Sequence, residues 1–140
     1  MGKELAVQGC TFKASVTTGS ISAQCSTTTP PSTSDLASNK GIYFDKVTVI
    51  VPQGSTVTLL TPPPGATSPT GTLTTADTID IDGTGDNILD SSGNKALLKG
   101  DSGHKTITFT FPAPNGTTVP YGVDVTVEVD DSGQDKVIAL

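Results

Sequence analysis

The sequence predicts a single all-β domain. Residues 123–129 alternate strictly between valine and polar residues, turn-forming residues recur about every 8–12 positions, and no long segment has a helical period. The composition agrees, because the 140 residues include 15 Gly and 10 Pro, no Trp, and many Thr and Ser. One domain over residues 1–140, either a small sandwich or a conical body of stacked strands, is the expected architecture.

The expected elements are short strands separated by turns. In chain order the strands span residues 4–12, 15–23, 42–44, 47–51, 57–60, 78–81, 96–99, 106–111, 123–129 and 136–140. Two strands have a clear apolar face: Val47, Val49 and Val51 in one, and Val123, Val125, Val127 and Val129 in the other. Residues 26–34 are Ser, Thr and Pro only, and residues 61–72 contain four prolines, so we expect loops there.

Two stretches of the chain resemble each other. Residues 39–51 and 94–111 each contain Asn-Lys, a short apolar run, a tight turn, a lysine and a long alternating strand. We interpret them as two related β-hairpin units, in which the apolar run pairs with the long strand that follows it. The second unit would turn at residues 100–103.

Charge and hydropathy exclude several kinds of partner. The net charge is −6, and all eight basic residues are Lys, so the arginine that best recognises phosphate and guanine is missing. We therefore expect no nucleic-acid partner. No apolar run approaches the roughly 20 residues of a membrane helix, and residues 1–7 lack the apolar region of a signal peptide. We expect the chain to fold in a cytoplasm.

The residues do not favour an enzyme. The chain has one histidine, His104, in a Gly-flanked turn, and it lacks the Gly-x-Ser-x-Gly pattern of serine hydrolases. Sugar-cleaving sites usually carry aromatic platforms, whereas this chain has no Trp and two Tyr. We therefore expect a non-enzymatic protein.

Two groups of residues are candidate metal ligands, although we expect no cofactor. Cys10, Cys25 and His104 are soft or borderline ligands that could hold Zn or Fe. The alternatives are two free thiols, or a disulfide that closes a loop of about 15 residues and stabilises the fold by roughly 3 kcal/mol. The second group, Asp80, Asp82 and Asp86, gathers carboxylates around glycines as calcium loops do. The alternative is an acidic hairpin turn, because Asp82-Gly83 at the end of the strand at 78–81 is a strong turn signal.

Four short segments resemble PAAR-like proteins, which belong to phage tails and contractile injection systems. They are Leu5-Ala6-Val7-Gln8-Gly9-Cys10, Lys40-Gly41-Ile42-Tyr43-Phe44, Leu97-Leu98-Lys99-Gly100-Asp101-Ser102-Gly103 and Gly133-Gln134-Asp135-Lys136-Val137. The Pro-Ala-Ala-Arg motif itself is absent. The resemblance implies a conical β-structure that caps a trimeric spike, in a particle assembled in the host cytoplasm, with transient contact with a target membrane and a metal bound by His and Cys.

The expected function is that of a structural component of a phage-like contractile particle, at the central tail spike or the baseplate. Its partner would be a trimeric spike, baseplate or coat protein of the same particle. Two alternatives remain open at this point: a capsid-decorating (cement) protein, and an immunoglobulin-like binding module for a receptor or glycan.

Overall fold

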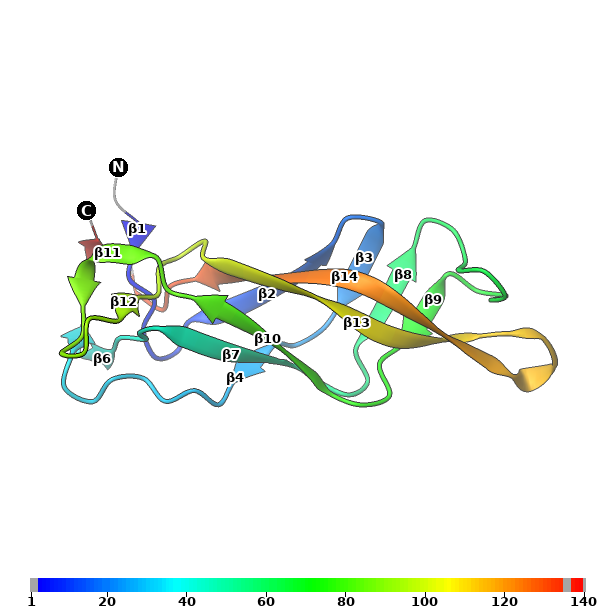
Figure 1. The fold of residues 1–140 in the computed structure, drawn as a ribbon, viewed down its shortest axis with the longest axis horizontal. Coiled ribbons are helices and arrows are strands. Elements are labelled where there is room, and N and C mark those ends of the chain that lie inside the picture. Colours follow the sequence, from blue (N-terminus) through cyan, green and yellow to red (C-terminus); the bar gives the residue numbers. More distant parts are fainter. Residues whose placement is uncertain (1–2, 135–136, 140) are drawn as a thin grey trace.

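The computed structural model describes residues 3–134 and 137–139, and the regular secondary structure of this part of the chain is almost entirely β-strand (Figure 1). The strands are β1 (Lys3–Glu4), β2 (Thr11–Val16), β3 (Gly19–Ser22), β4 (Ser26–Thr27), β5 (Leu36–Ala37), β6 (Lys40–Gly41), β7 (Lys46–Val51), β8 (Thr56–Leu59), β9 (Thr70–Thr72), β10 (Asp77–Asp82), β11 (Gly85–Leu89), β12 (Lys95–Ala96), β13 (Ser102–Pro112), β14 (Thr118–Asp131) and β15 (Ile138–Ala139). Within the described residues, the helical content is one 3-10 turn, Pro114–Gly116. The prediction of an all-β chain is confirmed.

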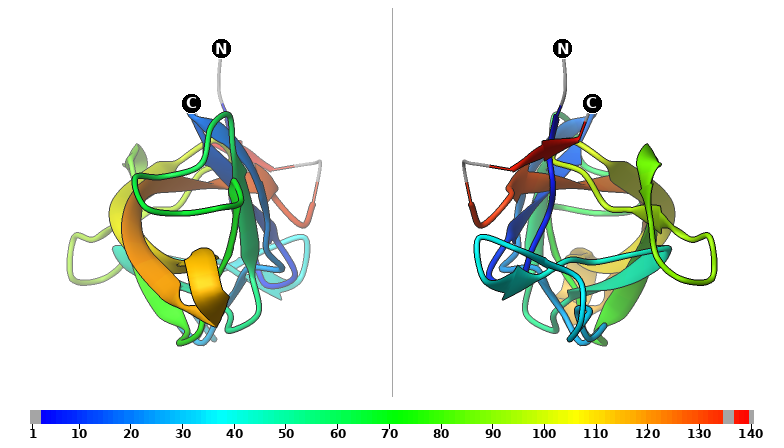
Figure 2. Two further views of the ribbon diagram at one scale, coloured as in Figure 1. Left: turned by 90° about the vertical axis from the view of Figure 1, so that its right-hand side faces the viewer. Right: turned by 90° about the vertical axis from the view of Figure 1, so that its left-hand side faces the viewer.

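The largest sheet has six strands and is nearly closed on itself. Its order is β2-β14-β13-β9-β8-β3, and its two end strands, β2 and β3, are consecutive in the chain and lie close together. A second sheet, β10-β7-β4, lies against β13. Viewed along the long axis, these strands surround one central core (Figure 2).

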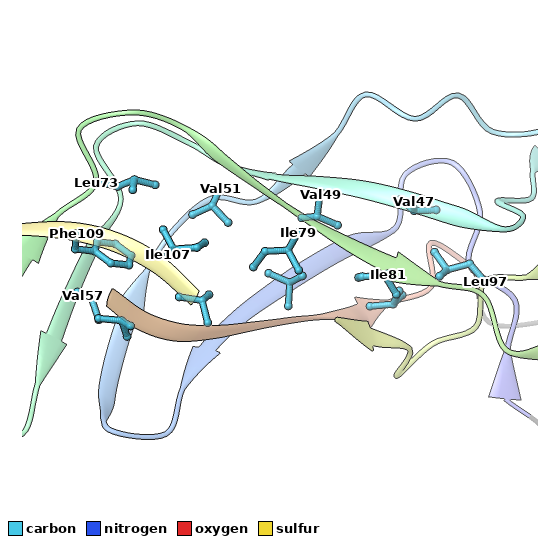
Figure 3. Packing of buried hydrophobic residues seen from close by; sticks show 14 of the residues in the cluster. Val47, Val49, Val51, Val57, Leu73, Ile79, Ile81, Leu97, Ile107 and Phe109 are labelled. Carbon is cyan, nitrogen blue, oxygen red and sulfur yellow. The ribbon is translucent and has the colours of Figure 1, made fainter. Parts of the chain in front are cut away.

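The core is formed by the faces that strand alternation predicts. Val123, Val125, Val127 and Val129 of β14 are all buried, as are Val47, Val49 and Val51 of β7. Both predicted faces are confirmed. They meet isoleucines of β10 and the aromatic side chains of β13, and together these residues fill the interior (Figure 3).

The end of the molecule opposite the chain termini is formed by a long hairpin and the Pro-rich loop (Figure 1). β13 and β14 pair from Ser102↔Glu128 to Pro112↔Thr118. The predicted loop at 61–72 is shorter than expected, because its last residues form β9. Gly71 permits this pairing, since a Cβ atom at that position would lie 2.7 Å from the Phe111 ring.

The predicted pairing within the two related units is wrong. Neither apolar run pairs with the long strand that follows it: β7 pairs with β10 and β4, and β13 pairs with β14 and β9. The hairpins at these two places are instead β5-β6 and β11-β12, whose strands lie almost entirely before the apolar runs in the sequence. The physical reason is that residues 42–44 and 96–98 are apolar on both faces, so they need cover on both sides, which a hairpin on the surface would not give.

Two further expectations about strands are also corrected. The strand expected over residues 4–12 is interrupted by a turn at Gln8 and Gly9, where Gly9 has a φ of 92°. The Asp82-Gly83 pair does not close a hairpin, because β10 pairs with β7 and β11 pairs with β12. Gly83 is required by close packing instead, since a Cβ atom there would lie 2.4 Å from the carbonyl oxygen of Lys95.

Candidate functional site: a three-sided hairpin end

Three short apolar segments form a closed ring of backbone contacts near the chain termini. They are residues 5–7, 42–44 and 96–98, which we call the backbone ring. The last residue of each segment lies opposite the first residue of the next one, in antiparallel bridges: Val7↔Ile42, Phe44↔Ala96 and Leu98↔Leu5. The three segments therefore occupy equivalent positions around the ring.

Two sets of three backbone hydrogen bonds run around the ring. The Tyr43 N–H donates to the Ala6 carbonyl oxygen at 3.3 Å, the Leu97 N–H to Tyr43 at 2.9 Å, and the Ala6 N–H to Leu97 at 2.9 Å. A second set of three bonds, each 2.8 Å long, joins the residues beside the ring segments and is donated in the opposite direction: from the Gln8 N–H to Gly41, from Asp45 to Lys95, and from Lys99 to Glu4. This arrangement has approximate threefold symmetry, built from one chain.

Each of three two-stranded hairpins at this end leads into one ring segment. The hairpins are β5-β6, β11-β12 and β15-β1. The third differs from the others because its two strands come from opposite ends of the chain, with Lys3 opposite Ala139 and Glu4 opposite Ile138. Viewed along the long axis, the three hairpins lie at three corners (Figure 2, right). We call this part of the molecule the hairpin end.

The backbone ring separates two apolar clusters. The middle residues Ala6, Tyr43 and Leu97 belong to the main core. The flanking residues instead form a smaller cluster under the hairpins: Leu5, Val7, Ile42, Ala96 and Leu98 with Ala37, joined by the partly buried Phe44, Ile88 and Val137. The ring segments are thus covered on both faces, which explains why their sequences do not alternate.

A buried carboxylate fixes the turn after the third ring segment. Asp101, which is 6% exposed, accepts hydrogen bonds from the backbone N–H of Leu98 at 2.8 Å and from the Thr84 N–H and hydroxyl at 3.2 and 2.5 Å. The backbone N–H of Asp101 donates to the Leu98 carbonyl oxygen, and the Asp101 carbonyl oxygen accepts from the Val129 N–H. Gly100, with a φ of 91°, makes this turn. The Gly-Asp step therefore joins the ring to β14 and to the start of β11.

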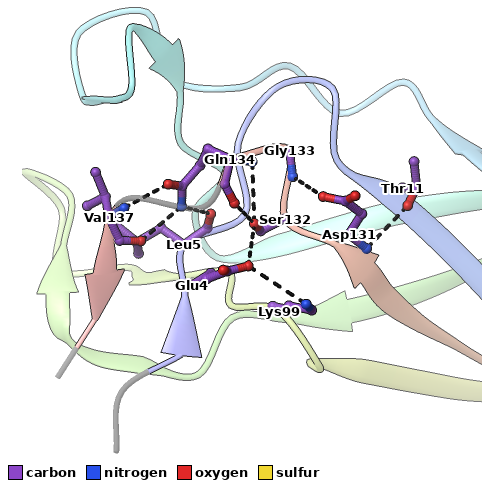
Figure 4. A network of polar contacts seen from close by, with 9 residues as sticks. All are labelled: Glu4, Leu5, Thr11, Lys99, Asp131, Ser132, Gly133, Gln134 and Val137. Atoms are coloured by element: carbon purple, nitrogen blue, oxygen red, sulfur yellow. Dashed lines mark hydrogen bonds and ion pairs between the residues drawn. The ribbon is translucent and has the colours of Figure 1, made fainter.

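A polar network joins the two ends of the chain at the third hairpin (Figure 4). The buried Ser132 hydroxyl bonds Glu4 Oε1 at 2.8 Å and also contacts the carbonyl oxygen of Gln134. The Gln134 amide donates to the carbonyl oxygens of Leu5 and Val137, both at 2.9 Å, and accepts from the Val137 N–H at 2.7 Å. The third corner is therefore held by specific side chains as well as by strand pairing.

The structure does not bring Cys10, Cys25 and His104 together. Both cysteines are free, partly buried and packed against the main core, whereas His104 lies on the outer face of β13, with Nδ1 3.5 Å from Asp124 Oδ1. Burial raises the pKa of the Cys10 thiol to about 11, and burial also raises the pKa of Cys25. Among residues 3–134 and 137–139, no three His, Cys, Asp or Glu side chains are grouped as metal ligands.

The three aspartates of the predicted calcium loop are likewise separate. Asp80 and Asp82 lie on exposed positions of β10, and Asp80 accepts a hydrogen bond from the Thr48 hydroxyl at 2.8 Å. Asp86 belongs to β11 and forms an ion pair with Lys95 at 2.7 Å. Asp80 and Asp86 thus each have a partner within the protein, and the three aspartates do not form a calcium loop.

Sequence reasoning missed the hairpin end as a site. Two of its three parts were visible as related units, but the third is divided between residues 3–10 and the C-terminal segment. The signal that could have found it is the shared pattern of three apolar residues, one polar residue and glycine, in Leu5-Ala6-Val7-Gln8-Gly9 and Ala96-Leu97-Leu98-Lys99-Gly100.

No protein-family model matches the chain, and comparisons with curated proteins and with solved structures find no match. The described residues contain no helix with the length and apolar character needed to span a membrane. The PAAR-like resemblance stays a prediction from the sequence.

Proposed function

We propose that this chain is a non-enzymatic structural component of a phage-like contractile particle. In this proposal the particle is assembled in the host cytoplasm, and the chain attaches to the central tail spike or baseplate. The observation that carries the proposal is the backbone ring. A single chain with approximate threefold symmetry at one end can face a homotrimer and make similar contacts with all three of its subunits.

The positions of the PAAR-like segments also support this proposal. They are scattered through the sequence, yet they meet at the hairpin end: the segments beginning at residues 5, 40 and 97 contribute to the ring, and Gln134 holds Leu5 from the fourth. The resemblance and the symmetry thus concern the same part of the molecule.

The mechanism would be mechanical. A nearly closed sheet around one core resists deformation, because every strand is paired and its inner face is packed. No reaction is assigned to the chain, and no cofactor. The alternatives are a capsid-decorating protein and a receptor- or glycan-binding module, which predict different copy numbers and partners.

Quantitative mass spectrometry of purified particles tests the proposal. We expect the chain to copurify with a homotrimeric spike or baseplate protein at one copy per three subunits. Hundreds of copies per particle would favour the decorating protein instead. Recovery only as a free monomer that binds a sugar or receptor would overturn the structural role.

A further inference from the structure

Three exposed apolar side chains occupy equivalent places at the hairpin end. Leu36, Leu89 and Ile138 are 53%, 51% and 49% exposed, and we call them the apolar triad. Each lies on the first strand of its hairpin, and their partners across the hairpin are Gly41, Lys95 and Glu4. Each of these partners directly precedes a ring segment, so the three positions correspond around the approximate threefold axis.

This correspondence is not a general feature of the surface. The described residues include two other large exposed apolar side chains, Leu60 and Tyr121, which are 82% and 41% exposed. Both lie toward the opposite end, where with Thr18 and three consecutive prolines they line a shallow hollow. The apolar side chains at the hairpin end alone follow the symmetry of the ring.

The matched exposure of the three side chains is not explained by a shared sequence. The corresponding corners have different sequences, and the third is assembled from the two ends of the chain, yet each carries one apolar residue of similar size and exposure. Apolar side chains at matched positions around an axis favour an occupant that presents three identical apolar contacts.

We infer that the apolar triad is the docking surface of this protein and that its occupant is the end of a homotrimer. This inference rests on the proposed function and adds which face binds and through which side chains. Each triad residue would contact one subunit of the trimer. Three anchors of this kind bind cooperatively, because the first contact places the other two at high local concentration.

Substitution of the triad tests the inference. The probe is the intact homotrimeric protein that copurifies with this chain from particles, and its affinity for the chain is measured by biolayer interferometry. The variants Leu36→Thr, Leu89→Thr and Ile138→Thr keep a β-forming side chain and remove apolar surface. We expect each single variant to weaken binding by about tenfold, and the triple variant by more than about a hundredfold. Leu60→Thr is the matched control and should bind like the wild type.

The possible outcomes distinguish a failure of the docking-surface inference from a failure of the proposed function. If the wild-type chain does not bind the trimer at all, both proposals fail. If it binds, and Leu60→Thr weakens binding while the triple variant does not, the docking surface is wrong and the proposed function stands. If the wild-type chain self-associates through the triad in light scattering, the occupant is a second copy and the inference is overturned. Should the triple variant unfold, the three single variants carry the test.

Discussion

The Asp101 carboxylate accepts a hydrogen bond from the backbone N–H of Leu98 at 2.8 Å, across the turn that follows the third ring segment. The same carboxylate also holds Thr84, which immediately precedes β11. One buried acid thereby positions a ring segment relative to the hairpin at the same corner. Because both belong to the proposed binding end, Asp101 links the stability of the fold to the shape of that surface.

Replacing Asp101 with alanine should destabilise the protein by about 3 kcal/mol, because the buried N–H of Leu98 and the part-buried N–H and hydroxyl of Thr84 lose their acceptor. In thermal unfolding this corresponds to a fall in the midpoint of about 10 °C. The control is Asp82→Ala, which removes an exposed carboxylate at the end of β10 and should change the midpoint little. A similar midpoint for the two variants would contradict the role assigned to Asp101.

Replacing Val125 with aspartate should unfold the chain or cost more than about 4 kcal/mol, because Val125 is 0% exposed and the new charge would have no partner in the core. Thr126→Asp places the same side chain on the opposite, partly exposed face of β14 and should have a much smaller effect. Chemical denaturation of both variants checks this. Equal losses of stability would reject the assignment of the two faces.

Strand alternation made the main core predictable. In β14 the period of two is uninterrupted, so the valines at 123–129 could be assigned to one face from the sequence alone. The ring segments could not be assigned in this way. Residues 42–44 and 96–98 have no alternation, because both of their faces are buried, and such a run does not reveal which strand it pairs with.

The third corner was unpredictable for a different reason. Its strands, β1 and β15, are each two residues long, and the residues that pair are separated by nearly the whole chain. Short strands carry little local signal, and a pairing so distant in sequence leaves no repeat to recognise. Residue type and spacing also did not reveal where the predicted ligand residues lie, since Cys10 packs against the core while His104 lies on the surface.

Replacing Gln134 with alanine should loosen the third corner without unfolding the main core. The Gln134 side chain makes three hydrogen bonds to the backbone of Leu5 and Val137, so its loss should speed hydrogen exchange at the amides of these two residues about tenfold or more. Exchange at Val125 should not change. Gln53→Ala, in an exposed turn, is the matched control, and similar exchange at Leu5 in both variants would contradict this role.

Cys10 should react slowly with alkylating reagents in the folded protein. Its pKa is raised to about 11 by burial, so the thiolate fraction at pH 8 is about a hundredfold lower than for a thiol with the ordinary pKa of 9.0. The same shift contributes stability that is present below about pH 9 and is lost as the pH rises towards 11. Mass spectrometry after iodoacetamide treatment, with urea-unfolded protein as the control, checks the reactivity. Equal labelling of the folded and unfolded chains at pH 8 would show that burial does not protect Cys10.

The pairing of β1 with β15 has a consequence for the order of events in folding. Contacts between residues close in sequence form early, whereas this strand pair requires the largest loop in the molecule to close. Two corners of the hairpin end can therefore be complete while the third is still missing. A partner that must contact all three corners at once would not bind such an incompletely folded chain. Docking would therefore admit only fully folded protein to the assembly.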